Sequence, residues 1–437
     1  DDDDFSPLVS KKPVAPVRPA NNQTFADDDD DLDLPVLKKV AAPVVDDDDE
    51  DDTVVPTPIR PPVLDDDDED DAELSVPTKA APVDEDDDRP DVAGSDEDKK
   101  LARSYKPKLW IKITSTILGA TILGLPVLLI TRKKYQERKK AIKEKLAFIK
   151  KVSAAQIFLG NGSDEIIDLL FRAFCEPGKD NIIICPPTYP MYEVNANINN
   201  IGIKLAPLLA DFQLNVAHIE QLVDDNTKII WICSPNNPTG NSLDRIDIET
   251  VLNHFNGLVV VDEAYINFSK QKSFVQSLED YPNLVVLQTL SKAWGLAGLR
   301  VGMCFANEAI VGYLNKVKAP YNISMVAQEL VLKALEEVGQ VNDMIQHLVE
   351  MRIALAEVIA SMPLVEKVYP SDTNFLLVKI PKATELYKFL CSKGIIVRDR
   401  SGLPNCEDTV RLTVGNEQEN TELVDAMAEW IEKIMIP

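Results

Sequence analysis

Histidine is scarce in this chain of 437 residues, since only three occur. None of them stands in a metal-ligand spacing or in a Ser-His-Asp pattern. The six cysteines lie far apart, and the chain has no C-x-x-C pair that would suggest a zinc site. The sequence therefore predicts no metal site and no triad hydrolase, and it indicates free thiols buried in a reducing compartment at Cys175, Cys185, Cys233, Cys304, Cys391 and Cys406.

Basic and aromatic residues are few in residues 1–100, where 34 Asp or Glu stand against 10 Lys or Arg. The formal net charge of the whole chain is -26, so the acidity belongs almost entirely to this part. It is also a low-complexity array of aspartate runs separated by Pro, Val, Ala and Lys, which predicts a disordered acidic tail. Weak calcium capture or docking to a basic partner remains the alternative, and the charge gives no reason to expect nucleic-acid binding.

Charge is missing altogether from Ile113 to Thr131. An apolar helix over residues 109–131 would be long enough to span a bilayer, so a single transmembrane helix is expected there. The alternative is a buried hydrophobic helix or a fusion junction. The basic cluster that follows favours a cytoplasmic location for the C-terminal part, anchored to the membrane by this segment.

From Tyr135 onward, short apolar runs alternate with helical stretches, which is typical of an α/β domain with a largely parallel sheet. A large domain over 135–323 and a smaller C-terminal α+β domain over 324–437 are expected. Each predicted strand is followed by a polar motif, where open α/β sheets place their ligands. These strands are Ile182–Cys185, Ile229–Cys233, Leu258–Val261 and Leu284–Leu287.

Two glycine- and tyrosine-containing motifs come first. In G-N-G-S-D-E, Gly160 and Gly162 are expected to form a loop and Ser163 to cap a helix that runs to about Phe174. Free N–H groups at such a helix start bind phosphate, although an ordinary capping motif looks the same. In P-P-T-Y-P-M-Y, Tyr189 and the tyrosine at 192 could stack on a flat heterocycle or simply fill the core.

Three further motifs follow the later strands. S-P-N-N-P-T-G holds Asn237 in a rigid loop, and D-E-A-Y places Asp262 at the end of a buried strand, where its charge needs a cationic partner. T-L-S-K-A-W-G-L-A-G-L-R then presents Lys292 and Arg300, which would be ordinary surface residues if they stood alone. In this order, the motifs resemble those of fold-type I pyridoxal-phosphate aminotransferases, and most of all histidinol-phosphate aminotransferases, over residues 143–437.

The resemblance implies pyridoxal 5'-phosphate as the cofactor and a role for each matching residue. Lys292 would form the imine with the cofactor, Asp262 would pair with its ring nitrogen, and Tyr265 would bond its phenolate oxygen beside Asn237. Arg411 would hold an α-carboxylate of the substrate or of glutamate, and Arg398, 13 residues earlier, would help to bind the substrate phosphate. The expected cofactor-binding set is Gly162, Ser163, Asp164, Tyr189, Asn237, Asp262, Tyr265, Thr289, Ser291, Lys292 and Arg300.

The resemblance also implies the activity, which is transamination between L-histidinol phosphate and 2-oxoglutarate in a homodimer. Decarboxylation of a phosphorylated amino acid and aromatic transamination on the same fold remain alternatives, as does a membrane-tethered chimaera without catalysis. Family members carry an N-terminal arm whose tyrosine reaches the partner subunit's cofactor. No such motif is found here, and Tyr135 lacks the Pro-Asp-Pro that would follow it.

Overall fold

The computed structural model describes residues 131–436. The predicted acidic tail over 1–100 and all of the predicted transmembrane segment except its last residue lie outside the described residues. Within 131–436, none of the helices is both long and apolar enough to cross a membrane. The described residues include all of the motifs that resemble those of aminotransferases.

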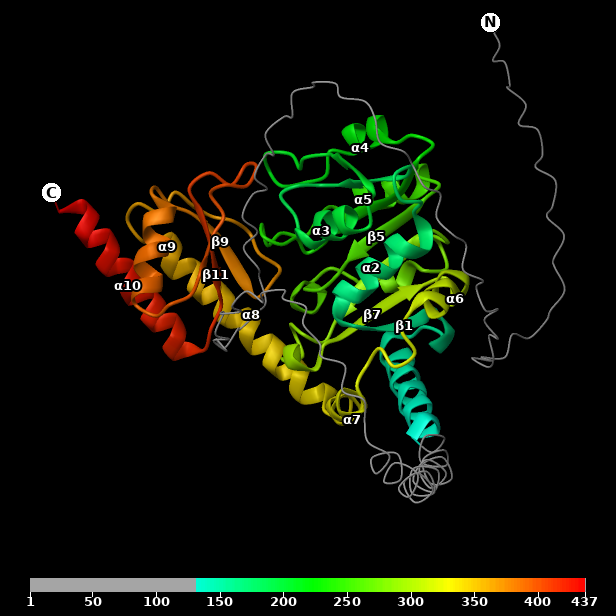
Figure 1. The fold of residues 1–437 in the computed structure, drawn as a ribbon. Coiled ribbons are helices and arrows are strands. Elements are labelled where there is room, and N and C mark those ends of the chain that lie inside the picture. The colour runs from blue at the N-terminus through cyan, green and yellow to red at the C-terminus, as the bar shows by residue number, and fades with distance from the viewer. Residues whose placement is uncertain (1–130, 437) are drawn as a thin grey trace, which may run out of the picture. The chain divides into compact units, whose positions relative to one another are not determined.

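A seven-stranded sheet forms the centre of the N-terminal part, with the strand order β1-β7-β6-β5-β4-β2-β3 (Figure 1). All neighbours from β6 to β3 are parallel, and β7 is antiparallel to both β6 and β1. The prediction of a mostly parallel sheet is thus confirmed. The strands are β1 Ile157–Asn161, β2 Asn181–Ile184, β3 Gly202–Leu205, β4 Thr227–Cys233, β5 Leu258–Asp262, β6 Leu284–Thr289 and β7 Val301–Ala306.

Helices cover both faces of this sheet. Successive side chains of each buried strand point to opposite faces, so the apolar strands present an apolar surface on both sides. On one face, Ile182 and Trp231 join a core with α2, α3 and α6. On the other, Ile183 and Ile230 join a core with α4, α5, α7 and the helix that occupies 131–150. The helices are α2 Gly162–Phe174, α3 Met191–Ile198, α4 Val216–Leu222, α5 Arg245–His254, α6 Glu308–Val317 and α7 Met325–Ala334.

The helix over 131–150 buries Ile142 and Leu146 in that second core. Tyr135 is also buried, at 2% exposure. Its hydroxyl oxygen accepts a bond from the Ile323 N–H at 3.4 Å, and its ring meets the Tyr321 ring edge-on at 5.0 Å. Tyr135 is therefore packed within its own chain.

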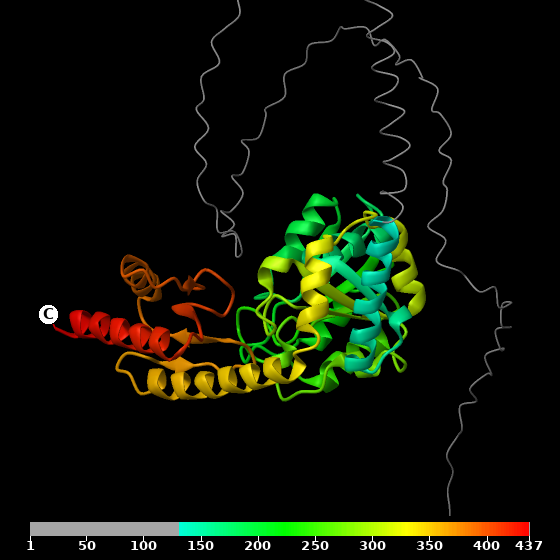
Figure 2. The same ribbon diagram turned by 90° about the horizontal axis from the view of Figure 1, so that it is seen from below.

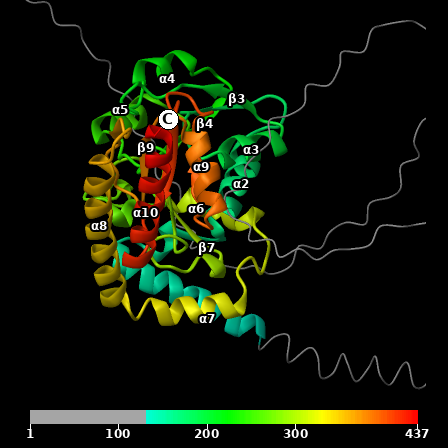
Figure 3. The same cartoon turned by 90° about the vertical axis from the view of Figure 1, so that its left-hand side faces the viewer.

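A second sheet lies in the C-terminal part, with the strand order β10-β11-β9-β8 and antiparallel pairing throughout. Three helices pack with it around a separate core. Figure 2 shows α10 running beside α8, and Figure 3 shows α9 on the other side of α10. The elements are α8 Val338–Ala360, β8 Lys367–Val368, β9 Phe375–Lys379, α9 Ala383–Ser392, β10 Arg398–Asp399, β11 Thr409–Thr413 and α10 Glu417–Met435.

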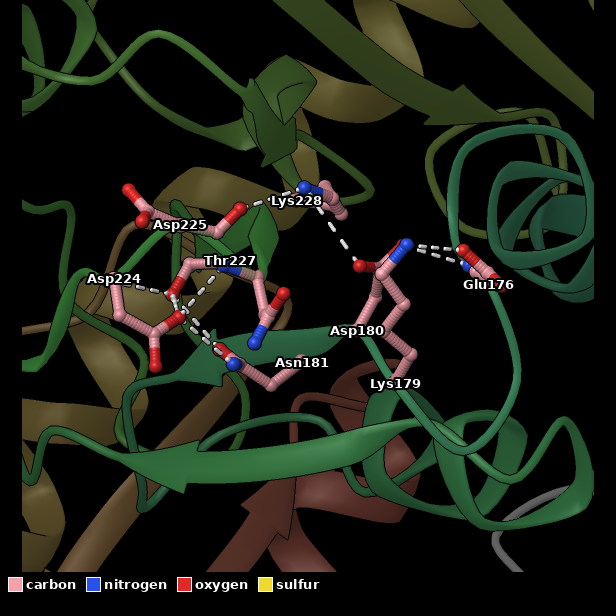
Figure 4. A network of polar contacts seen from close by, with 9 residues as sticks. Glu176, Lys179, Asp180, Asn181, Asp224, Asp225, Thr227 and Lys228 are labelled. Atoms are coloured by element: carbon pink, nitrogen blue, oxygen red, sulfur yellow. Dashed lines mark hydrogen bonds and ion pairs between the residues drawn. The ribbon is translucent and has the colours of Figure 1, made fainter.

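A polar network holds the amino ends of β2 and β4 together, at the edge of the sheet opposite to the predicted motifs (Figure 4). Asp224 accepts bonds from Lys204 at 2.6 Å and from Asn181 at 3.0 Å. These bonds hold the pKa of the Asp224 carboxyl below its ordinary range. The network joins strands at the amino edge of the sheet, so it contributes to the fold and leaves the carboxyl edge for the site.

One local expectation is wrong. Gly160 lies within β1, and β1 runs directly into α2, so Gly160 and Gly162 do not form a loop. The glycine that makes this direct turn possible is Gly162, whose φ of +75° lies in the left-handed region. Because α2 begins at Gly162, its N-cap position is Asn161 and Ser163 already lies inside the helix. The predicted end of the helix at Phe174 is confirmed.

Candidate active site

The carboxyl ends of β4, β5 and β6 bring Asp262 next to the predicted site motifs, because parallel neighbours end at one edge of the sheet. Asp262 is 3% exposed. One of its carboxylate oxygens accepts a bond from the Tyr192 hydroxyl at 2.7 Å, and the other accepts one from the Ala264 N–H at 3.1 Å. Burial raises the pKa of Asp262 to about 6, although both bonds and the Lys292 charge act in the opposite direction.

Asn237 is buried in the loop after β4, and the C-terminal sheet supplies its partner. The Arg411 Nη1 donates to the Asn237 side-chain oxygen at 2.6 Å. A guanidinium can only donate, so this bond fixes which end of the amide faces Arg411. The Asn237 amide nitrogen consequently points away from Arg411 and is available as a donor on the other side.

Tyr265 and Lys292 come together beside these residues. The Lys292 Nζ lies 5.7 Å from the centre of the Tyr265 ring. Burial raises the pKa of the Tyr265 hydroxyl, while the positive charges of Lys292 and Arg411 lower it. The positive charge of Lys292 also lowers the pKa of Asp262. Residues from three widely separated motifs thus share one site.

The residues predicted to bind phosphate lie where β6 ends and α2 begins. The Thr289 hydroxyl donates to the Ser291 hydroxyl at 3.0 Å. Arg300 has a left-handed backbone with φ of +50°, and its Nη2 donates to Asp164 at 3.0 Å. The Arg300 guanidinium passes so close to Gly162 that a Cβ there would lie 2.7 Å from Nη2. Hydroxyl groups, a guanidinium and a helix N-terminus together are suited to an anion.

Tyr189 lies at the edge of the same region. Its hydroxyl donates to Asp164 at 3.1 Å, so Asp164 joins Tyr189 to Arg300. Its ring meets the Tyr192 ring edge-on at 5.6 Å. Ser163 stands one residue before Asp164 in the first turn of α2, where its backbone N–H belongs to the helix N-terminus.

The two predicted substrate arginines lie opposite each other on paired strands, since Arg398 of β10 is the register partner of Arg411 of β11. The Arg411 guanidinium carbon lies 5.0 Å from the centre of the Phe375 ring, and its Nη1 reaches Asn237. Arg398 donates to the Val397 carbonyl oxygen at 3.3 Å. Arg411 is therefore directly connected to the Asp262 side of the site, whereas Arg398 lies one strand further out.

One residue of the site was not assigned from the sequence. Tyr192 contacts Asp262, yet the sequence offered a site role only through stacking in P-P-T-Y-P-M-Y. Tyr189 lies just before α3 and Tyr192 lies in its first turn, so the sequence indicates only that the two rings are near each other. The partner of the second tyrosine could be found only from the packing of α3 against β5.

A model of the family "Aminotransferase class I and II" matches residues 130–427. The histidinol-phosphate aminotransferase of Flavobacterium psychrophilum is 49% identical over 290 residues, which are 66% of this chain and 84% of that protein. The enzyme of the same name from Cytophaga hutchinsonii is 50% identical over 289 residues, covering 66% and 83%.

Solved structures share the fold. The crystal structure of the histidinol-phosphate aminotransferase from Clostridium acetobutylicum superposes with a TM-score of 0.63 at 23% identity, covering 68% of this chain and 90% of that one. The Sinorhizobium meliloti structure, solved in complex with pyridoxal-5'-phosphate, has a TM-score of 0.63 at 22% identity and covers 69% and 82%.

The sheet and its carboxyl-edge motifs define an α/β transferase of the fold-type I pyridoxal-phosphate class. Within that class, the chain belongs to the class I and II aminotransferase family, in its histidinol-phosphate aminotransferase branch.

Proposed function

We propose that this chain catalyses pyridoxal-phosphate-dependent transamination between L-histidinol phosphate and 2-oxoglutarate, giving imidazole acetol phosphate and glutamate. Its family membership supports the reaction class and histidinol phosphate as a substrate. The observation that carries the proposal is the buried Asp262 carboxylate at the end of β5, with Lys292 and the Arg411–Asn237 pair beside it.

The donor set fits the cofactor. A buried carboxylate whose pKa is raised to about 6 is costly alone, and a protonated pyridine nitrogen is the kind of partner that would offset the cost. Asn237 and Tyr265 would hold the phenolate oxygen, with Tyr189 beside the ring. The phosphate would be held by the N-terminus of α2 and by hydroxyl and guanidinium groups, which belong to Gly162, Ser163, Asp164, Thr289, Ser291 and Arg300. When bound, pyridoxal phosphate supplies an electron sink for the substrate α-carbon.

Lys292 would carry the proton between the substrate α-carbon and the site, because its amine lies beside Tyr265 and interacts electrostatically with Asp262. Asp262 would stay anionic while it is paired, and Tyr192 and the Ala264 N–H would hold it in place. Arg411 would bind the α-carboxylate of glutamate, and its present bond to Asn237 keeps that guanidinium directed into the site. Arg398 would help to bind the phosphate of histidinol phosphate.

The proposal extends to assembly and domain division. Homodimers are typical of this family, and we propose one here. We also propose that the division between the large and small domains falls at residues 323 and 324. The second sheet has a core of its own, while α7 packs with the core of the first sheet. Light scattering of the purified chain, which distinguishes one copy from two, tests the dimer.

The decisive experiment compares absorbance spectra of the wild-type protein, Lys292→Ala and the control Lys388→Ala after incubation with pyridoxal phosphate. Lys388 lies exposed on α9, so its loss changes the charge by the same amount away from the site. A visible band is expected for the wild type and the control and should be missing from Lys292→Ala.

Addition of L-histidinol phosphate with 2-oxoglutarate should then produce glutamate. A wild-type protein without the band would contradict the cofactor assignment. Carbon dioxide release from a phosphorylated amino acid, without glutamate, would instead favour the decarboxylase alternative.

A further inference from the structure

Tyr192 is the most deeply buried polar side chain in contact with the site, at 0% exposure on α3. Its ring stacks on the Trp231 ring of β4 with centroids 4.8 Å apart and planes 18° apart. The edge-on contact with Tyr189 holds the ring from a second side. Because two aromatic contacts hold the Tyr192 ring, the ring has little room to rotate or shift. The packing of the core therefore sets the position of its hydroxyl.

That hydroxyl donates to one oxygen of Asp262 at 2.7 Å, while the Ala264 N–H donates to the other oxygen at 3.1 Å. The two donors come from different elements, α3 and the turn after β5. Together they fix the plane of the carboxylate. Each carboxylate oxygen can accept more than one bond, so both donors can stay in place when a further cationic partner arrives.

We propose that Tyr192 is a positioning residue that acts through Asp262: its hydroxyl, held by the stack on Trp231, orients the Asp262 carboxylate and keeps it ionised for the cofactor ring nitrogen. The inference rests on the proposed function, because it assigns that partner to Asp262. It adds a residue to which the sequence motifs gave no such role.

The electrostatic environment favours Tyr192 as the donor and Asp262 as the acceptor of this hydrogen bond. Burial, together with the nearby Asp262 charge, raises the pKa of Tyr192 well above its ordinary value, so the hydroxyl keeps its proton. The titratable groups that face Asp262 are Tyr192 from α3, Cys233 from β4, Tyr265 from the turn after β5, Asp164 from α2 and Lys292 from the turn after β6. Of these, Tyr192 donates a side-chain hydrogen bond to the carboxylate at 2.7 Å.

The test compares Tyr192→Phe with the control Tyr313→Phe. Tyr192→Phe keeps both ring contacts and removes one hydroxyl. Tyr313 lies half-exposed on α6, where its ring contacts Phe174 and Lys316. The dissociation constant for pyridoxal phosphate is measured by absorbance titration between pH 6 and pH 8.5.

Tyr192→Phe should bind pyridoxal phosphate about tenfold to hundredfold more weakly, the range for a lost bond to a charged group. The deficit should be larger at pH 6 than at pH 8.5, because loss of the donor raises the Asp262 pKa further. A merely structural role would weaken binding equally at every pH. Equal affinity of Tyr192→Phe and wild type, or a loss independent of pH, would overturn the proposal.

Two results keep this inference separate from the proposed function. If the wild type itself binds no pyridoxal phosphate, the proposed function fails; if the wild type and Tyr313→Phe bind normally and Tyr192→Phe does too, only the inference fails. Should Tyr192→Phe not fold, Trp231→Phe keeps the hydroxyl and weakens its support. Trp231→Phe is then expected to lose less affinity for pyridoxal phosphate than Tyr192→Phe would, again with a larger loss at pH 6 than at pH 8.5. A loss of affinity that is equal at both pH values counts against the proposal.

Discussion

Replacement of Asp262 by asparagine should make the cofactor-free protein more stable at neutral pH, although it removes the partner of the cofactor ring. The reason lies in the burial of the carboxylate, which is 3% exposed. An asparagine would keep the local bonds: its oxygen can accept from the Ala264 N–H, and the Tyr192 hydroxyl can reverse and accept from the new amide. The substitution therefore removes a costly charge while both neighbours of residue 262 keep a bond to it.

The size of the effect follows from the pKa. The Asp262 pKa is raised from the ordinary 3.8 to about 6, and each pH unit corresponds to about 1.4 kcal/mol, so the buried charge costs about 3 kcal/mol. The native state binds the proton more tightly than the unfolded chain does. Stability is therefore lost as pH rises from about 4 to about 6, and the full cost applies above that range. Asp262→Asn should regain up to about 3 kcal/mol at pH 8 and almost nothing at pH 4.

The measurement is urea unfolding of the cofactor-free proteins at pH 4 and pH 8, with midpoints converted to free energies. Asp425→Asn on the exposed face of α10 serves as the matched control, since it removes the same charge where no burial cost exists. The reasoning is refuted if Asp262→Asn is no more stable than wild type at pH 8, or if it gains equally at both pH values.

Three further results are expected. Arg411→Lys should lower kcat/KM for glutamate by about tenfold to hundredfold, because lysine cannot hold a carboxylate in two places; steady-state kinetics at varied glutamate test this. Gly162→Ala should cost about 1–3 kcal/mol of unfolding free energy, because alanine is strained in the left-handed backbone conformation at this position. It should also weaken pyridoxal phosphate binding, because the added Cβ would displace the Arg300 guanidinium. Urea denaturation measures the first effect and absorbance titration the second. Asp224→Ala should lose stability at pH 7 and lose less near pH 2. The contribution of the lowered Asp224 pKa is complete only above the ordinary range and declines as the pH falls below that range. Urea unfolding at both pH values measures the two losses, and an equal loss at each would contradict the prediction.

Much of the architecture could be predicted from local patterns. Runs such as Ile229–Cys233 and Leu258–Val261 are apolar throughout, which is typical of strands covered on both faces, and both became central strands of the large sheet. The rule that parallel strands carry ligands at their carboxyl ends then placed the motifs near one another. The start of α2 could not be predicted in the same way, because the sequence does not show that β1 continues without a loop into Gly162.

The sequence by itself determined which kinds of group belong to the site. The order of the motifs matches that of one family, and this match identified Asp262, Lys292 and the arginines as site residues. Only the tertiary structure decided which of these groups touch. The Arg411–Asn237 bond joins residues 174 apart in the chain, and the Tyr192–Asp262 bond joins residues 70 apart. Local sequence fixes where a strand ends, but a contact between distant segments depends on how α3 and the C-terminal sheet pack against that end. The direction of a hydroxyl or an amide is therefore set by the packing of the whole core.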